Sequence, residues 1–248
     1  MMRTRIATSD AQSITVRGRD LVNELIGHHS FTEILYFLVC ERMPEPADTR
    51  VLDACLVTLM EHGLNPSTLV ARLMADSVPD QVQVAIGAGL MAIGDVFAGT
   101  MEGCARILTD GVHASDPARY CADVAARHRA EKRPMPGFGH RTHKPDDPRT
   151  PRLLTVAAEA GRDGRFVALL RQLGTAVDEA AGRHVTINAT GSIAALLLEI
   201  GIPVPVMRAM AVVSRAGGLA GHVREEQRTG SARHIWDLAR AGISYENS

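Results

Sequence analysis

Apolar residues recur along most of the chain at the spacing of a helix face. In residues 47–63, one side of a helix would carry Val51, Leu52, Cys55, Leu56 and Leu59. The glycine that closes this stretch suits a helix end. Similar patterns predict helices over residues 31–42, 81–108, 117–130, 151–161, 165–181, 191–200, 205–215 and 218–228. Strand signals are scarce, and the pattern therefore predicts a nearly all-α protein.

Residues 133–151 break this pattern. The segment holds five prolines, which remove helical hydrogen bonds, and it gathers six cation-capable side chains: Arg133, His140, Arg141, His143, Lys144 and Arg149. Two interpretations stay open. The segment is either a solvated basic loop whose charge Asp146 and Asp147 balance, or a phosphate- and carboxylate-binding loop that its prolines hold rigid.

The overall composition excludes several classes of protein. Hydrophobic residues make up 46% of the 248 positions, enough to bury a large core. Lys plus Arg number 27 against 28 Asp plus Glu, so the chain lacks the basic excess typical of nucleic-acid binders. We expect no membrane span, because no apolar run reaches about 18 residues. The N-terminus lacks the apolar stretch of a secretory signal, and we expect a cytoplasmic protein.

The cysteines and histidines show no metal-binding spacing. Cys40, Cys55, Cys104 and Cys121 form no C-x-x-C pair, and we expect them to be reduced, buried thiols. His140 and the histidine three residues later could share a metal, but no cysteine or carboxylate motif frames them. The sequence therefore predicts no metal site.

Six segments, in order along the chain, together resemble the citrate synthase superfamily. PGFGHRTHKPDDPR is similar to the PG-[FY]-GH…DPR signature of citrate synthases and citryl-CoA lyase domains. HGLNPSTLVAR and SRAGGLAGHVREEQ resemble further family segments, and INATGSIAALLLEIGIP occupies the place of the N-V-D-G helix start. GDVFAGTMEGCARIL and ARHIWDLARAGISY are similar to segments of the citryl-CoA lyase part of ATP-citrate lyase.

The resemblance implies a citrate synthase-like, all-α fold in a short version, with the active site in a cleft between a large and a small helical domain. On that basis the large domain comprises residues 1–98 and 186–248. The small domain, residues 99–185, carries the PGFGH loop. The resemblance further implies a homodimer or higher homo-oligomer. It implies a coenzyme A thioester and a di- or tricarboxylate as substrates, and no permanently bound cofactor.

The resemblance also assigns roles to individual residues. His140 corresponds to the histidine that polarises the oxo or hydroxyl group, and His62 to a second site histidine that contacts a substrate carboxylate. Arg149, Arg215 and Arg233 correspond to arginines that bind substrate carboxylates, and Arg233 would reach the partner protomer's site. The coenzyme A site of the family matches a third set of positions: Gly137, Gly139, Arg141 and Lys144.

Simpler structural roles stay open for several of these residues. His140 could be a loop histidine whose ring bonds a backbone carbonyl, and His62 could face a helix C-terminus. Arg215 and Lys144 could face solvent instead of an anion.

Two positions depart from the family pattern. Phe97 stands where synthases place a catalytic histidine. The lyase domain of ATP-citrate lyase resembles this chain in having a phenylalanine at that place, so the departure points to the lyase side of the family. Thr190 stands where the family has its acid/base aspartate, and a threonine hydroxyl is not a base near neutral pH. A helix N-cap is the structural alternative for Thr190. Candidates to replace the carboxylate are Asp95, Glu102 and His143.

Three functional hypotheses follow. The first is a citryl-CoA lyase-like enzyme that cleaves, or reversibly forms, a carbon–carbon bond between an acyl-CoA thioester and a 2-oxo acid such as oxaloacetate. In this scheme His140 takes the hydroxyl proton. The second is a citrate synthase-type acyltransferase or a thioester hydrolase acting in the same site. The third is a degenerate protein that binds coenzyme A or citrate without turnover, because Phe97 and Thr190 replace the catalytic histidine and aspartate.

Overall fold

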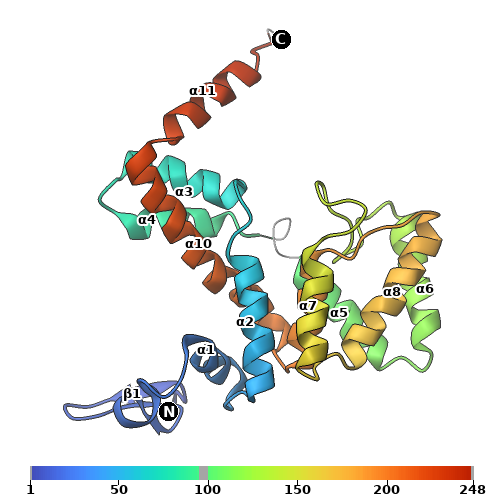
Figure 1. The fold of residues 1–248 in the computed structure, drawn as a ribbon, viewed down its shortest axis with the longest axis horizontal. Helices are drawn as coiled ribbons and strands as arrows, with labels where there is room; N and C mark the ends of the chain where they lie inside the picture. The colour runs from blue at the N-terminus through green and yellow to red at the C-terminus, as the bar shows by residue number, and fades with distance from the viewer. Residues whose placement is uncertain (1, 95–99, 247–248) are drawn as a thin grey trace. The chain divides into compact units, whose positions relative to one another are not determined.

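The computed structural model describes residues 2–94 and 100–246, which are mostly helical (Figure 1). Contacts group the chain into two compact units: unit 1 is Met1–Cys55 with Met101–Met207, and unit 2 is Leu56–Thr100 with Arg208–Ser248. The expected nearly all-α architecture is confirmed. The predicted domains, residues 1–98 with 186–248 and residues 99–185, have other boundaries than these units and stay a prediction.

Unit 1 begins with a small antiparallel sheet of strand order β1-β2-β3, made of β1 (Ala7–Ser9), β2 (Ile14–Val16) and β3 (Arg19–Asp20). Arg17 and Gly18 connect β2 to β3 with φ angles of 45° and 83°, as a two-residue hairpin turn requires. A single π-helical turn, Leu21–Leu25, follows. The sequence pattern did not predict these strands, because two or three residues are too few to show alternation.

One of the remaining helices of unit 1 is largely buried. These helices are α1 (Phe31–Cys40), the first part of α2 (Pro46–Met60), α5 (Thr100–Val112), α6 (Pro117–Ala130), α7 (Arg149–Glu159), α8 (Arg165–Ala181) and α9 (Ala189–Glu199). Helix α9 contacts α7 and α8, and α8 also packs on α6. Most of α9 is buried, which fits a helix that is apolar on nearly every side.

Unit 2 contains α3 (Pro66–Ser77), α4 (Val82–Met91), most of α10 (Met207–Thr229) and α11 (Ala232–Gly242). Its small core joins α3, α4 and α10 through Ala71, Ala75, Ala85, Leu219 and Val223. Helix α3 was not predicted from periodicity, but its start has clear signals, with Asn65 as a hydrogen-bonded N-cap and proline at the first helical position.

Two helix predictions were wrong at glycines. The predicted helix over 81–108 is not continuous: α4 ends at Met91 and α5 begins at Thr100. Conversely, the helices predicted over 205–215 and 218–228 form one uninterrupted α10. A Cβ at Gly218 would collide with the carbonyl of Met60, so this glycine allows α10 to approach the end of α2 and does not break the helix.

Candidate active site

The proline-rich loop of unit 1 is held against the segment that leads into α9. Gly139 N–H donates to the Thr186 carbonyl at 2.8 Å, and Asn188 N–H donates to the Gly137 carbonyl at 3.0 Å. Gly137 and Gly139 have φ angles of 83° and 74°, which favour glycine. A Cβ at Gly137 would lie 2.7 Å from the sulfur of Cys104. These contacts support the interpretation of a rigid loop.

The surroundings of His140 define how its ring is protonated. Its Nδ1 accepts hydrogen bonds from the backbone N–H groups of Thr142 at 3.1 Å and His143 at 2.9 Å. Since Nδ1 is an acceptor, the neutral ring carries its proton on Nε2. Burial lowers the pKa of His140, and the nearby His143 lowers it further. His140 is therefore placed as a neutral hydrogen-bond donor.

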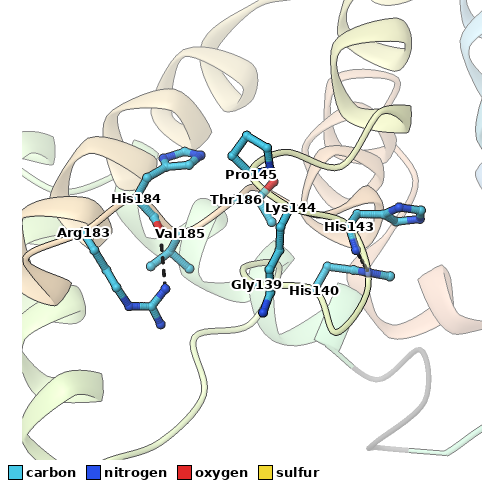
Figure 2. A pocket seen from close by; sticks show the side chains of 9 residues that line it. All are labelled: Gly139, His140, His143, Lys144, Pro145, Arg183, His184, Val185 and Thr186. Atoms are coloured by element: carbon cyan, nitrogen blue, oxygen red, sulfur yellow. Dashed lines mark hydrogen bonds between the residues drawn. The ribbon is translucent and has the colours of Figure 1, made fainter.

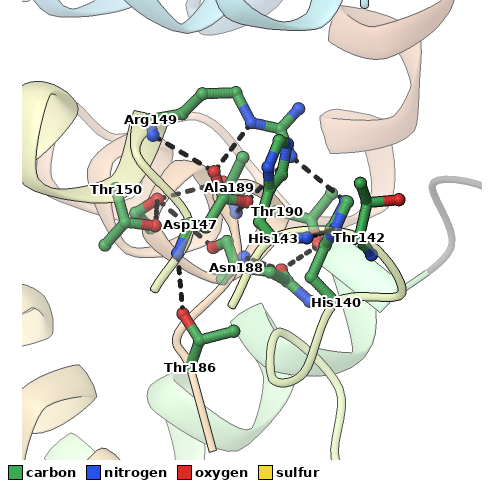
Figure 3. Close-up of polar contacts among 12 residues, drawn as sticks. His140, Thr142, His143, Asp147, Arg149, Thr150, Thr186, Asn188, Ala189 and Thr190 are labelled. Carbon is green, nitrogen blue, oxygen red and sulfur yellow. Dashed lines mark hydrogen bonds and ion pairs between the residues drawn. The ribbon is translucent and has the colours of Figure 1, made fainter. Parts of the chain in front are cut away.

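Arg149 is fixed by the buried carboxylate of Asp147. Its Nε donates to Asp147 Oδ1 at 2.9 Å and its Nη2 to Oδ2 at 2.8 Å, while Ala189 N–H donates to the same Oδ2 at 3.0 Å (Figure 3). Burial alone would raise the pKa of Asp147, but the hydrogen bonds from Arg149 and Ala189 lower it to about 2. Nη2 of Arg149 also lies 3.4 Å from Nε2 of His140.

Thr190 lies in the first turn of α9 and is not its cap. Asn188 is the N-cap, and its Oδ1 accepts from Gly191 N–H at 3.1 Å and from the Thr190 hydroxyl at 2.6 Å. The amide nitrogen of Asn188 donates to the Gly139 carbonyl at 2.8 Å. The N-cap alternative for Thr190 was thus wrong by two residues, because the side chain of Asn188 reaches the free N–H groups first.

A pocket of about 300 Å³ opens beside His140 (Figure 2). It is lined by Gly139, His140, His143, Lys144, Pro145, Arg183, His184, Val185 and Thr186. The rings of His140 and His143 stack with centroids 4.3 Å apart. Of the positions matched to coenzyme A binding, Gly139 and Lys144 line this pocket. The buried Gly137 and the exposed Arg141 are not among its lining residues.

Sequence reasoning missed two pocket residues, Arg183 and His184. The ring nitrogens of His184 lie 2.7 Å from Asp178 and 2.9 Å from Asp146, so both face carboxylates. These hydrogen bonds, from Asp178 first and Asp146 second, raise the pKa of His184. The sequence feature that could have indicated these residues is the adjacent arginine and histidine shortly before the INATG segment.

A second polar cluster lies in unit 2, around Glu61. Its Oε2 is 3.0 Å from His222 Nε2 and 3.5 Å from Arg215 Nη1. Its Oε1 accepts the backbone N–H of His62 at 2.9 Å. Burial lowers the pKa of Arg215, against the attraction of Glu61. Arg72 donates to the other nitrogen of His222 at 3.0 Å, so the cluster alternates cations, carboxylate and imidazole.

Arg233 pairs within its own chain. It lies at the start of α11, and its Nε donates to Asp76 Oδ2 at 2.7 Å. The start of α11 is anchored by Glu226, which accepts from Ser231 and from the Ala232 N–H at 2.7 Å and pairs with Arg72 at 3.0 Å. The predicted reach of Arg233 to a partner protomer stays a prediction.

The structure thus places the predicted site residues in two groups. Unit 1 holds His140, Arg149 and Thr190 with the pocket residues, and unit 2 holds His62, Arg215 and Arg233. Phe97 and Asp95 lie outside the described residues. Glu102 is buried on α5 and lies 3.8 Å from Arg106.

Other features bear on the chemistry of the chain. All four cysteines are free, and Cys55, Cys104 and Cys121 are buried, while Cys40 is partly exposed. Residues 2–94 and 100–246 contain no group of three or more His, Cys, Asp or Glu side chains that could hold a metal ion. Within the same residues, every helix is too short or too polar to span a bilayer.

The chain is similar to known enzymes in sequence and in structure. Residues 40–240 match the family model for the citrate synthase C-terminal domain. A putative citrate synthase 2 of Mycobacterium tuberculosis is 30% identical over 196 residues, which cover 75% of this chain and 50% of that relative. The chain therefore spans about half the length of the curated relatives it matches.

Two solved structures extend the similarity to a lyase. Citryl-CoA lyase from Hydrogenobacter thermophilus superposes with a TM-score of 0.89 at 28% identity, covering 100% of this chain and 95% of that one. A Methanosaeta concilii ATP citrate lyase in complex with (3S)-citryl-CoA shares the fold, with a TM-score of 0.83, 17% identity and coverage of 100% and 42%. The chain belongs to the citrate synthase family, with a fold close to that of citryl-CoA lyase.

Proposed function

We propose that this protein cleaves a carbon–carbon bond in a 3-hydroxy polycarboxylate thioester of coenzyme A, of which citryl-CoA is the test case. The products would be an acyl-CoA and a 2-oxo acid such as oxaloacetate. The proposal is supported by the similarity to a citryl-CoA lyase across nearly the whole length of both chains. The same groups would serve both cleavage and formation of this bond.

The observation that carries the proposal is the pairing of His140 with Arg149. Two N–H donors, His140 Nε2 and Arg149 Nη2, lie 3.4 Å apart, and both are held in place by other bonds. An oxygen atom that approaches both nitrogens can accept a hydrogen bond from each. Fixed donors of this kind stabilise an oxygen on which negative charge develops as a hydroxyl becomes a carbonyl.

The roles of the residues follow from their chemistry. His140 would donate to the substrate oxygen from Nε2, which differs from the initial expectation that this ring takes the hydroxyl proton. Arg149 would contribute its remaining N–H groups to the oxygen or an adjacent carboxylate. Lys144 and Arg183 in the pocket carry the positive charge that coenzyme A phosphates require. His62, Arg215 and Arg233 would bind the other carboxylates.

A direct assay tests the proposal. Purified protein is mixed with citryl-CoA in one reaction and with oxaloacetate plus acetyl-CoA in another, and free coenzyme A, acetyl-CoA and oxaloacetate are followed. We expect oxaloacetate and acetyl-CoA from citryl-CoA, and loss of this activity in His140→Ala. His113→Ala is the matched control, because His113 is an exposed histidine outside the pocket lining, and this variant should keep wild-type activity.

Thr190 favours a second candidate, a protein that binds a coenzyme A ester or citrate without turnover. Its hydroxyl bonds Asn188 and offers no acid or base near neutral pH. This candidate predicts no product in either reaction together with calorimetric binding of citrate. Free coenzyme A with citrate, without acetyl-CoA, would instead identify a thioester hydrolase, and product from oxaloacetate plus acetyl-CoA alone would identify a synthase.

We further propose a homodimer in which Arg233 serves the partner's site. Two inactive variants, His140→Ala and Arg233→Ala, are mixed under conditions that exchange subunits. If Arg233 acts across the interface, mixed dimers contain one intact site and regain up to about a quarter of wild-type activity, since about half of randomly mixed dimers are hybrid. No regain, with exchange verified by mass spectrometry, would place Arg233 in its own protomer's site.

A further inference from the structure

The family's acid/base aspartate is replaced by Thr190 in unit 1, so another group must transfer the proton. Cleavage of a 3-hydroxy thioester moves one proton from the hydroxyl oxygen to the carbon that leaves, and this requires a group able to accept and return a proton. Thr190 cannot do so. The following inference rests on the proposed function and concerns which residue moves that proton.

The carboxylates near the pocket are unsuited to this task. Asp147 is fully buried, both of its oxygens are bound by Arg149, and its pKa is lowered to about 2. Asp146 pairs with His184 at 2.9 Å, and 66% of the Asp146 side chain is exposed to solvent. Glu102 pairs with Arg106 and is not a lining residue of the pocket.

His140 is also unsuited as the proton carrier. Two backbone N–H groups, at 2.9 and 3.1 Å, use the lone pair of Nδ1, and Nε2 already carries the proton. Burial, the neighbouring His143 and the Arg149 guanidinium oppose a second proton on this ring and lower its pKa, against the attraction of Asp147. The ring is built to donate a hydrogen bond and to stay neutral.

We propose that His143 is the catalytic acid/base of this site. Its ring stacks on that of His140 with centroids 4.3 Å apart and planes inclined by 24°, and both residues line the same pocket (Figure 2). Within the described part of the chain, His143 contacts His140 through this stack and through its own backbone N–H, which leaves both ring nitrogens for substrate. Imidazole accepts and donates protons near neutral pH.

The step balances with His143 alone. A ring nitrogen accepts the hydroxyl proton while the oxygen forms its carbonyl double bond and the neighbouring carbon–carbon bond breaks. The electron pair of that bond passes to the α-carbon of the thioester as an enolate. The imidazolium of His143 then returns its proton to this carbon, which gives the acyl-CoA, the 2-oxo acid and a neutral ring. His140 holds the oxygen throughout.

The groups that face His143 are His140, Lys144 and, through His140, Arg149. His140 Nε2 and the Arg149 guanidinium are hydrogen-bond donors, so the His143 ring lies next to groups that can hold a substrate oxygen.

The test compares His143→Phe, which keeps an aromatic ring for the stack, with His143→Ala. We expect kcat for citryl-CoA cleavage to fall at least about 100-fold in both variants with KM within about threefold, the usual scale of a lost acid/base. We also expect added imidazole to restore activity to His143→Ala but not to His143→Phe. A structural role would instead lower the melting temperature of His143→Ala and leave it unresponsive to imidazole.

The outcomes separate the two proposals. Wild-type protein that does not cleave citryl-CoA overturns the proposed function and this inference with it. Active wild-type protein with His143→Phe within about threefold of its kcat overturns the inference alone.

Discussion

Arg149 in unit 1 and Arg215 in unit 2 are both matched to substrate carboxylates, but the chain holds them differently. Arg149 makes a two-point contact at 2.8 and 2.9 Å with Asp147, which is fully buried. Arg215 faces Glu61 at 3.5 Å, and 40% of the Glu61 side chain is exposed. The first arrangement fixes a cation before substrate arrives, whereas the second leaves a desolvated cation with a loosely held counter-ion.

The difference has a physical consequence. A two-point contact fixes the orientation of a guanidinium as well as its position. The contact also leaves Arg149 with fewer donors for substrate, because the N–H groups that bond Asp147 cannot bind a substrate oxygen as well. Arg215 keeps more free donors and pays more for burial, which lowers its pKa. We therefore interpret the surroundings of Arg149 in unit 1 as preorganised, and those of Arg215 in unit 2 as a charge pairing that an added anion can exchange.

Removal of Asp147 should have the largest effect. Asp147→Ala leaves a guanidinium without its buried partner and removes the acceptor of the Ala189 N–H, so we expect a loss of about 4 kcal/mol in the free energy of unfolding. Urea denaturation measures this loss. Asp146→Ala is the matched control and should cost less than about 1 kcal/mol, because Asp146 is exposed. Equal losses would contradict the preorganised role of Asp147.

The same carboxylate predicts how stability falls in acid. The folded-state pKa of Asp147 is about 2 and lies below the unfolded value, so its contribution is fully present above the unfolded pKa. It is lost as the pH falls through about 4 towards 2. The difference in unfolding free energy between wild type and Asp147→Ala should shrink over this range, and a constant difference would refute it.

A pair of glycine variants tests the rigidity of the loop. Gly137 and Gly139 both have positive φ, but a Cβ at Gly137 meets Cys104 at 2.7 Å while one at Gly139 meets nothing nearer than Val185 at 4.0 Å. We expect Gly137→Ala to cost about 3 kcal/mol of unfolding free energy and Gly139→Ala about 1 kcal/mol. Similar values would mean that the loop can move away from α5.

Glu61→Gln should have a smaller effect on stability. Glu61 is partly exposed and its pair with Arg215 is long, so we expect a loss below about 1 kcal/mol in urea denaturation. Removing its charge frees Arg215 for an added anion, and we expect tighter calorimetric binding of citrate. A loss near that of Asp147→Ala would remove the contrast between the two units.

The smallest effect concerns pH and His184. Both ring nitrogens face carboxylates. Because a carboxylate only accepts hydrogen bonds, the ring must be protonated on both nitrogens to donate to both of them. Its folded-state pKa is raised, and the stabilisation is therefore fully present below the unfolded pKa and lost as the pH rises through the folded value. The ring is half exposed, so about 0.5 kcal/mol is expected. Melting temperatures of wild type and His184→Asn should converge as the pH rises.

Much of the fold could be predicted from local patterns. The helices α6 and α8 begin and end where periodicity, an N-terminal proline or a closing glycine predicts them. The prediction failed at Gly217 and Gly218, which lie inside α10. Their effect depends on the approach of α2, a contact between residues about 160 positions apart that no local pattern records.

The site divides in the same way. By itself the sequence determined the helical class, the family and the candidate residues His140, Arg149 and Thr190, because helical periodicity and short motifs are local properties. Only the tertiary structure decided that Asp147 binds both Arg149 and the start of α9, and that the lone pair of His140 Nδ1 is already used. Protonation and charge pairing depend on which groups meet in space, and a linear pattern does not contain those meetings.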